Sequence, residues 1–259
     1  MKRDRLTQSG GGLLGVFAAL ALSAPAAAQN TCPCPPTPKP GWAGSVGAGL
    51  SLNSGNSDTK SYNLDAGAVY DPQTKNLLRL SGLYLRSDSR GAATIDKSAL
   101  GAHDEYTISG RGFLFGEVGY QRDRLKGLDY LLSPSLGVGY KLVAEKRVTL
   151  ATDGGVGLAI EKLTSRASTT GGSLRVGQSL TYQISDSASF RQSFGAIWKV
   201  SDFADAYYHL EADLTTSVAR RLDLKLAYIT DIKNKPASAG LEERDSAIVA
   251  AVVFKFRPS

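Results

Sequence analysis

Methionine, cysteine and histidine are scarce in this chain, and long apolar runs are missing. Met1 is the only methionine, and the 259 residues include two cysteines and two histidines. After the N-terminal region no apolar run approaches the roughly 20 residues of a membrane-spanning helix. No spacing of histidine, cysteine and aspartate resembles a set of metal ligands. The sequence therefore predicts neither a helical membrane protein nor a metal centre, and it gives no sign of a bound cofactor.

Basic residues exceed acidic ones only slightly, with a net charge of +6. They are spread along the chain and form no basic run, which argues against nucleic-acid binding. The first 28 residues also predict export. A basic start precedes an apolar stretch over 13–22, and Ala26 and Ala28 fit a small-residue cleavage site. We expect a cleaved signal peptide over 1–28 and a mature N-terminus at Gln29.

A proline-rich segment over 29–41 follows, and we interpret it as a periplasmic linker. It contains Cys32 and Cys34 in the run Cys-Pro-Cys-Pro-Pro. These cysteines are either a redox pair or a tail with two thiols. Alternate positions around a proline suit an unstrained disulfide poorly, which favours the second interpretation.

From Trp42 onward apolar and polar residues alternate, as in strands whose two faces meet different surroundings. In the first such segment Trp42, Val46 and Leu50 share one face, whereas Ser45 and Gly49 lie on the other. About twelve segments show this pattern, each about as long as a tilted strand needs to cross a membrane. They cover residues 42–53, 60–70, 77–87, 102–110, 113–123, 132–143, 148–162, 173–184, 189–200, 207–219, 222–232 and 244–256.

An even number of these strands predicts an all-β fold, a closed antiparallel transmembrane β-barrel over 42–259. Connections after even-numbered segments are short, as at 110–112 and 220–221, whereas most connections after odd-numbered ones are longer, as at 88–101 and 163–172. Short periplasmic turns opposite longer outer loops are typical of barrels in a Gram-negative outer membrane. Both termini are then expected in the periplasm.

Aromatic residues on the apolar faces fall at the two ends of the strands, as membrane interfaces favour. An exported soluble sandwich is the alternative, but it would have to bury apolar faces from nearly every strand in one core. At the short-turn end the aromatic residues are Trp42, Tyr70, Tyr140, Tyr182, Phe190 and Phe254, and at the other end they are Tyr62, Tyr84, Tyr120, Trp198, Tyr208 and Tyr228.

Two stretches, GSVGAGLSLNSGNSDT from Gly44 and GYQRDRLKGLDYLLSPSLGVGYKL from Gly119, resemble a family of salt-induced outer-membrane proteins, a domain of unknown function. The resemblance runs from about residue 42 to residue 256. It implies an outer-membrane barrel and carries no activity or catalytic residue. Two features depart from the pattern. Leu131 follows Tyr130 where a basic residue is usual, and three further residues follow Phe256, although such barrels often end on an aromatic residue.

The polar faces carry charges of both signs, which predicts a charged lumen. Such a lumen either filters solutes as a pore wall or is salt-bridged and conducts little, and twelve strands lie between filled small barrels and wide channels. The candidate lumen-lining residues are Asp65, Arg79, Glu117, Lys141, Asp153, Arg175, Arg191, His209, Glu211, Asp213 and Lys225.

Hydrolysis would need a nucleophile activated by a histidine. His103 stands beside Asp104 and Glu105, at the mouth of an irregular segment, and His209 shares a face with Glu211 and Asp213 as a potential acid–base cluster. Two isolated histidines carry little specificity, so we do not expect an enzyme.

The sequence predicts a narrow pore, or a salt-related envelope-stress barrel. The alternatives are a closed structural barrel without transport and, less favoured, a membrane-embedded hydrolase. Expected partners are outer-membrane lipid, the outer-membrane assembly machinery and small ions or solutes. Because Glu211 and Asp213 cluster on one segment, a pore is expected to prefer cations modestly.

Overall fold

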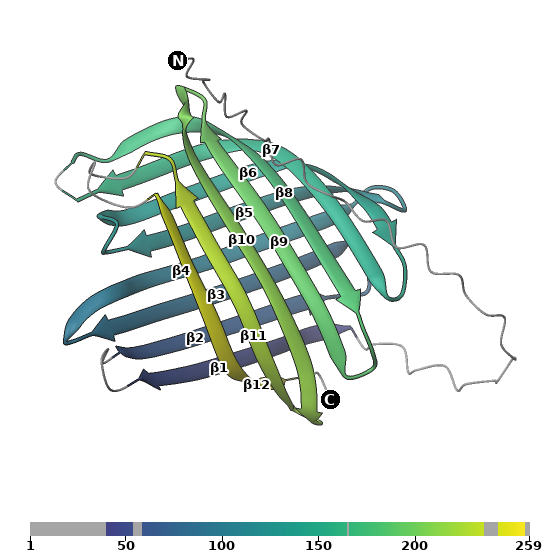
Figure 1. Cartoon of the computed structure of the whole chain (residues 1–259). Coiled ribbons are helices and arrows are strands. Elements are labelled where there is room, and N and C mark those ends of the chain that lie inside the picture. The colour runs from purple at the N-terminus through teal and green to yellow at the C-terminus, as the bar shows by residue number, and fades with distance from the viewer. Residues whose placement is uncertain (1–39, 54–58, 165, 236–242, 257–259) are drawn as a thin grey trace, which may run out of the picture. The chain divides into compact units, whose positions relative to one another are not determined.

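The computed structural model describes residues 40–53, 59–164, 166–235 and 243–256. Within these ranges twelve antiparallel strands form a closed barrel, in which each strand pairs with its neighbours in the sequence and β1 pairs with β12 (Figure 1). The expected signal peptide, its cleavage site at Ala28 and the linker with Cys32 and Cys34 lie outside the described residues. No helix in the described ranges is long and apolar enough to cross a membrane.

The predicted barrel and its twelve strands are confirmed. The strands are β1 (Gly41–Asn53), β2 (Thr59–Asp71), β3 (Asn76–Ser89), β4 (Ala92–Thr107), β5 (Gly112–Asp123), β6 (Leu128–Ala144), β7 (Val148–Leu163), β8 (Thr169–Gln183), β9 (Ala188–Lys199), β10 (Asp202–Ala219), β11 (Leu222–Lys233) and β12 (Arg244–Phe256).

Several expected connections are wrong, because the strands continue through them. The loop expected over 88–101 is a tight turn at Arg90 and Gly91, whose φ angles of 51° and 79° suit a two-residue hairpin. β6, β8 and β10 likewise begin before their expected starts. The extensions of β3 and β4 carry the outward carboxylates of Asp88 and Asp96, which form ion pairs with Arg86 at 3.1 and 3.9 Å. Alternating hydropathy therefore could not reveal them.

We call the two rims of the barrel the turn end and the loop end. The turn end carries the connections at 72–75, 108–111, 145–147, 184–187 and 220–221, together with the start of β1 and the end of β12. The loop end carries the other six connections, among them the two-residue turns at 90–91 and 200–201. The expected contrast in connection length is therefore weak, and only the connection over 234–243 is long.

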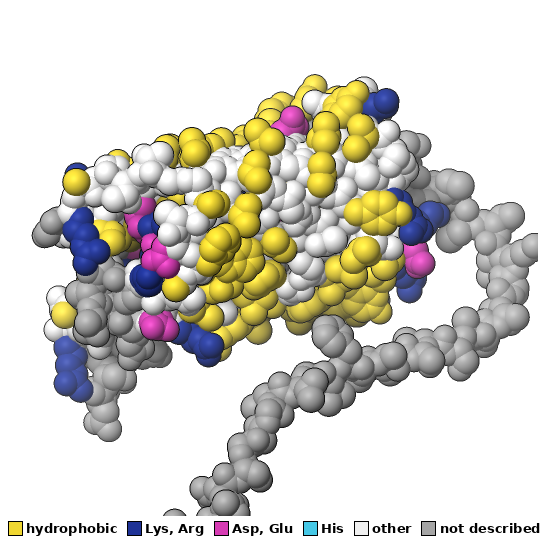
Figure 2. Space-filling model, turned by 90° about the horizontal axis from the view of Figure 1, so that it is seen from above, with side chains coloured by type: hydrophobic (Ala, Val, Ile, Leu, Met, Phe, Trp, Pro, Cys, Tyr) yellow, Lys and Arg dark blue, Asp and Glu magenta, His cyan; other side chains and the backbone are white. Residues whose placement is uncertain are grey.

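The outer face of the barrel is apolar between its two ends. Mid-strand side chains such as Ile248 (76%), Leu136 (66%) and Leu100 (61%) are largely exposed. In Figure 2 apolar side chains cover the middle of the surface, whereas most charged ones gather toward the two ends. An apolar outer band of this kind is what lipid requires and water disfavours. The band identifies a membrane barrel and excludes the soluble sandwich.

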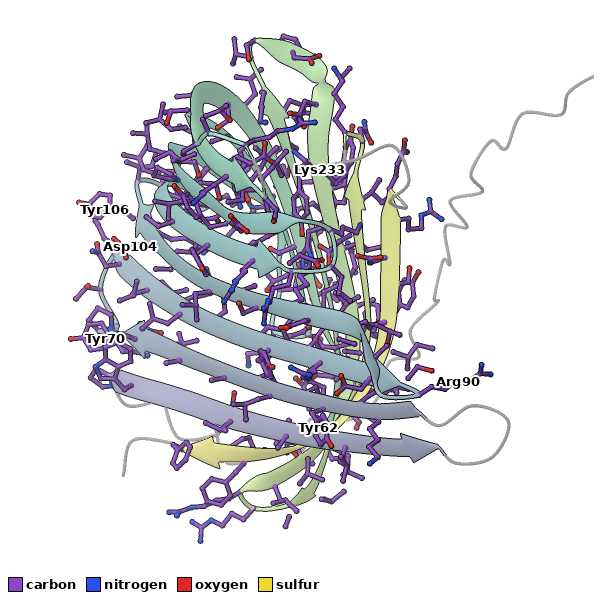
Figure 3. The ribbon with its side chains drawn as sticks, turned by 90° about the vertical axis from the view of Figure 1, so that its left-hand side faces the viewer. Tyr62, Tyr70, Arg90, Asp104, Tyr106 and Lys233 are labelled. Atoms are coloured by element: carbon purple, nitrogen blue, oxygen red, sulfur yellow. The ribbon has the colours of Figure 1, made fainter. Side chains whose placement is uncertain are left out.

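Aromatic side chains border the apolar band at both ends. At the turn end the rings of Trp42 and Tyr70 lie 5.1 Å apart. At the loop end the indole Nε1–H of Trp198 donates a hydrogen bond to the hydroxyl of Tyr208 at 3.2 Å. Figure 3 shows Tyr70 and Tyr62 toward opposite ends of β2. Two rings of amphipathic side chains match the two interfaces of a bilayer.

The substitution Leu136→Arg is expected to lower the free energy of unfolding in lipid vesicles by about 2–4 kcal/mol, because the charged side chain would face hydrocarbon at mid-strand. Leu136 is 66% exposed on the outer face. Ser179→Arg is the matched control, since Ser179 lies on the inner face between Ala151 and Ser193 in the strand register. Urea titration of both variants measures the difference. An equal loss of unfolding free energy at the two positions would show that our assignment of outward and inward faces is wrong.

Candidate functional site in the barrel lumen

The lumen holds three groups of charged and polar side chains, and ion pairs join members within each group. We define a wall cluster on β3, β4, β5, β7 and β8, a loop-end cluster on β4, β7, β9, β10 and β11, and a turn-end cluster on β2, β9, β10, β11 and β12. Their members are, in that order, Arg79, His103, Glu105, Glu117, Asp153 and Arg175; Lys97, Glu161, Lys199, Asp205, Tyr207, His209, Asp231 and Lys233; and Asp65, Arg191, Glu211, Asp213, Asp223, Lys225 and Lys255.

Arg175 is the centre of the wall cluster. Its Nε and Nη2 donate to the two carboxylate oxygens of Glu117 at 2.9 and 2.7 Å, and its Nη1 contacts Asp153. The Nδ1 of His103 lies 2.8 Å from Glu117, and its Nε2 lies 3.5 Å from Glu105. Bidentate pairing fixes the arginine geometrically as well as electrostatically. The cluster is thus a continuous hydrogen-bonded belt along the inner wall.

Two aromatic rings of β5 support this belt, and glycines of β6 leave room for them. The guanidinium of Arg175 lies 4.9 Å from the ring centroid of Phe115, and His103 stacks on the same ring at 5.4 Å. A Cβ at Gly139 would lie 2.1 Å from Phe113, and one at Gly137 would lie 2.7 Å from Phe115. The glycine-rich pattern of β6 is therefore a recess for the rings.

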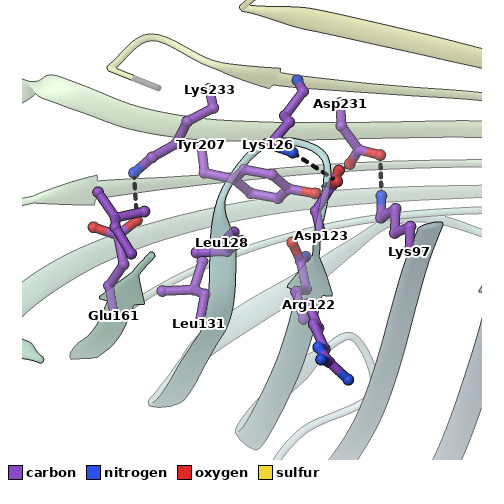
Figure 4. Close-up of a pocket in the computed structure, with 12 residues that line it drawn as sticks. Lys97, Arg122, Asp123, Lys126, Leu128, Leu131, Glu161, Tyr207, Asp231 and Lys233 are labelled. Carbon is purple, nitrogen blue, oxygen red and sulfur yellow. Dashed lines mark hydrogen bonds and ion pairs between the residues drawn. The ribbon is translucent and has the colours of Figure 1, made fainter. Parts of the chain in front are cut away.

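The loop-end cluster connects opposite sides of the barrel. Lys97 on β4 forms an ion pair with Asp231 on β11, and their side chains are 9% and 11% exposed. The hydroxyl of Tyr207 and the Nδ1 of His209 contact the same carboxylate, the latter at 2.8 Å. Figure 4 shows Lys97 and Tyr207 converging on Asp231. These contacts bridge the lumen with side chains.

Four alternating charges form a second bridge beside the first. Lys199 lies 2.5 Å from Glu161 and 2.6 Å from Asp205. Lys233 lies 2.8 Å from Glu161 and 2.6 Å from Asp205, which closes a ring of ion pairs. The cavity between this ring and the Lys97–Asp231 pair has a volume of about 30 Å³. That space holds no more than a few water molecules.

A cavity lies at each end of the lumen. The turn-end cavity, of about 280 Å³, is lined by Asp65, Arg191, Asp213 and Lys225 among other polar groups. The loop-end cavity, of about 290 Å³, lies beside Lys97 and Asp231. The buried side chains of Leu85, Ile229 and Val249 pack together with Ala227, and Leu83, Ile95 and Ala247 pack against them. The loop-end half of the lumen is therefore narrow and filled by side chains.

The candidate lumen-lining residues that the sequence predicted are divided among these clusters. Arg79, Glu117, Asp153 and Arg175 share the wall cluster, and the Nζ of Lys141 lies 4.0 Å from Glu105. Asp65, Arg191, Glu211, Asp213 and Lys225 belong to the turn-end cluster, where Lys225 lies 3.2 Å from Glu211.

The potential acid–base cluster at His209 contains a different acid from the two that the sequence suggested. His209 contacts Asp231 on the neighbouring strand, whereas Glu211 contacts Lys225. His103 lies within β4 and faces the wall cluster, away from Asp104, which pairs with Leu78 in the strand register. Lys97, Tyr207, Asp231 and Lys233 are absent from the predicted set. The inward position of Tyr207 and Asp231 in the alternation was the available signal, whereas Lys97 and Lys233 fall outside the expected segments.

A family model described as "Protein of unknown function, DUF481" matches residues 46–256. The chain belongs to this family. The chain is similar to the Uncharacterized protein YdiY of Escherichia coli (strain K12). The two are 24% identical over 234 residues, which cover 89% of this chain and 90% of YdiY. The salt-induced character that the sequence resemblance implied does not occur in these descriptions and stays a prediction.

Among solved structures, the COG4313 outer membrane channel from Pseudomonas putida F1 is 14% identical, with a TM-score of 0.49 and coverage of 85% of this chain and 97% of that one. The NanC porin is 10% identical, with a TM-score of 0.47 and coverage of 82% and 96%.

Proposed function

We propose that this DUF481-family barrel is a narrow outer-membrane pore for small ions or solutes, with its constriction in the loop-end half of the lumen. One observation carries the proposal. Two cavities of about 280 and 290 Å³ lie at opposite ends of one lumen, and side chains rather than backbone separate them. A side chain can change rotamer while the barrel stays folded, whereas a backbone plug has to unfold. Charged side chains that line a constriction are also a known basis of selectivity.

The charges at the turn end support a modest preference for cations. Acidic residues slightly outnumber basic ones in the lining of that cavity, where Asp65, Asp186, Asp213 and Asp223 face Arg191, Lys225 and Lys255. Ions that enter a low-dielectric vestibule respond to such an imbalance over short distances. The turn end is placed in the periplasm in this proposal, because β1 begins there and β12 ends there.

The contacts of the two histidines support a pore over a hydrolase. In the described ranges each histidine is paired with carboxylates, His103 with Glu105 and Glu117 and His209 with Asp231. No serine or threonine hydroxyl hydrogen-bonds to either ring in that part of the chain. A histidine that activates a nucleophile needs such a contact.

Planar-bilayer recording of purified protein tests the proposal. The wild type is expected to give small single-channel currents, with a reversal potential that indicates cation preference under a salt gradient. The double variant Lys97→Ala with Asp231→Ala is expected to raise the conductance several-fold, because it removes both arms of the lumen bridge.

A matched control is Glu211→Ala with Lys225→Ala, which removes an ion pair beside the wide turn-end cavity and is expected to leave the conductance nearly unchanged. Absence of current from both the wild type and the opened variant, with both demonstrably folded, would overturn the pore. The closed structural barrel would then be the better description.

A further inference from the structure

β1 and β12 are paired over only part of their length. Their register covers five residue pairs, from Gly44–Phe256 to Ala48–Val252. The same β1 pairs with β2 over all thirteen residues of Gly41–Asn53, and β12 pairs with β11 up to Arg244. Within the described residues the halves of β1 and β12 that approach the loop end therefore lack a mutual register. In Figures 1 and 3 these two halves diverge. We call this region the open seam.

Gly49 marks the point where the two strands separate. A Cβ at Gly49 would lie 2.1 Å from the carbonyl oxygen of Ala250, so the backbones of β1 and β12 are still in contact at this position. Beyond this point Leu50 and Ile248 flank the open seam and are 61% and 76% exposed. Apolar residues with such exposure belong to the lipid-facing band. The open seam therefore lies at membrane depth, where unpaired backbone is costly.

Behind the open seam lies an apolar surface that belongs to the lumen. Leu85 of β3 packs against Ile229 of β11 and Val249 of β12, and all three are buried. The loop-end cavity of about 290 Å³ borders this surface and is lined by the apolar side chains of Leu85, Ile95, Ile229 and Ala247 together with Lys97, Lys126, Asp123, Asp231 and Asp245. The cavity is therefore amphipathic, and its apolar part adjoins the gap in the barrel wall.

Of the two lysines in this cavity, Lys126 has the more exposed carboxylate partner. Lys126 Nζ lies 3.0 Å from Asp245, whose side chain is 51% exposed. It also donates to the carbonyl oxygen of Glu243 at 3.2 Å. An ion pair with such an exposed partner contributes little stability, so a competing anion exchanges with the carboxylate easily. An ammonium also accepts a carboxylate or a phosphate as a point charge without strict geometry.

We propose that the open seam is a lateral portal that admits the acyl chain of an anionic amphiphile from the surrounding membrane. The chain lies against Leu85, Ile229 and Ala247, and the head group reaches Lys126 in the loop-end cavity. The binding site goes beyond ion conduction and does not depend on it. A membrane lipid and a free fatty acid share this chemistry, and the experiment separates the two.

Cysteine pairs test whether the seam is open. Val46→Cys with Phe254→Cys joins two positions that face each other in the paired half of the seam. Leu52→Cys with Ile248→Cys joins positions that would face each other if the same register continued. Mild oxidation is expected to crosslink the first pair at least ten times faster than the second. Equal rates would show a closed seam and overturn the proposal.

Photolabelling tests the ligand in the folded full-length protein in vesicles. One arm uses palmitate with a diazirine in its chain, and the other uses phosphatidylglycerol with the same diazirine acyl chain. Either probe is expected to label the inward residues Leu85 and Ile229, which line the cavity, and the arm that labels them identifies the source. Ala247→Phe, which fills part of the cavity, is expected to reduce inward labelling about tenfold, whereas Leu226→Phe on the outer face is not.

Heat-modifiable mobility in gels confirms that each variant is folded. If both probes label only outward residues such as Leu226 and Ile248, the proposal is overturned, because lipid around any membrane barrel labels its outer face. The conductance measurements are independent of this result, so failure of the portal and failure of the pore are distinguishable.

Discussion

Asp231→Ala is expected to lower the free energy of unfolding by about 3–5 kcal/mol, because it leaves the buried ammonium of Lys97 without its partner. Both side chains of this ion pair are nearly buried in the lumen. The hydroxyl of Tyr207 and the ring of His209 lose the same acceptor. Equilibrium unfolding by urea in lipid vesicles, followed by tryptophan fluorescence, measures the change.

Asp202→Ala is the matched control for this substitution. Asp202 also forms an ion pair, with Lys235, but the two side chains are 44% and 50% exposed. Its loss is expected to cost far less than that of Asp231, because exposed ion pairs contribute little stability. The double variant Lys97→Met with Asp231→Leu is expected to recover part of the loss, because it removes both charges together. A cost for Asp231→Ala as small as that for Asp202→Ala would show a hydrated, loosely held pair.

The faces of the strands could be predicted from the sequence because they depend on a period of two residues. Leu136 faces outward and its neighbour Ser135 inward, and a shift of one residue would exchange them. Lipid enforces this alternation along every segment that lies in the apolar band. The number of strands follows from the same signal, since each crossing of the band repeats it.

The ends of the strands could not be predicted in the same way. At the loop end the strands extend beyond the apolar band, and residues such as Arg86 and Asp96 occupy their outer face. The outer face is then charged while the inner face carries apolar Leu85 and Ile95, so an apolar outer face no longer alternates with a polar inner face. Lys97 fell within an expected loop for this reason, so its place in the lumen was not foreseen.

Partners across the lumen depend on barrel closure, which no local pattern contains. Lys97 and Asp231 are 134 residues apart in the sequence. Even on one strand the sequence misleads, since His209 and Glu211 share a face but contact β11 instead. Residues opposite each other on neighbouring strands lie about 4.5–5.5 Å apart, closer than residues two apart on one strand. The residues that face the lumen could therefore be predicted from the sequence, but the clusters that they form could not.

Arg175→Met is expected to destabilise the barrel by about 3–5 kcal/mol, because it leaves two partly buried carboxylates without their common cation. Arg175 holds both oxygens of Glu117 and also contacts Asp153, and its own side chain is 12% exposed. His103 remains beside Glu117 at 2.8 Å but does not reach Asp153 in any described contact. Urea titration in vesicles measures the loss.

Arg175→Lys separates geometry from charge at the same position. Lysine keeps the positive charge but cannot form the bidentate contact to Glu117 and reach Asp153 at the same time. An intermediate loss is therefore expected, smaller than that of Arg175→Met. Adding Glu117→Gln and Asp153→Asn to Arg175→Met is expected to restore most of the stability, because the repelling charges are gone. If lysine proved as stable as arginine, the belt would hold by net charge alone, and the bidentate geometry would have no role in fixing the inner wall.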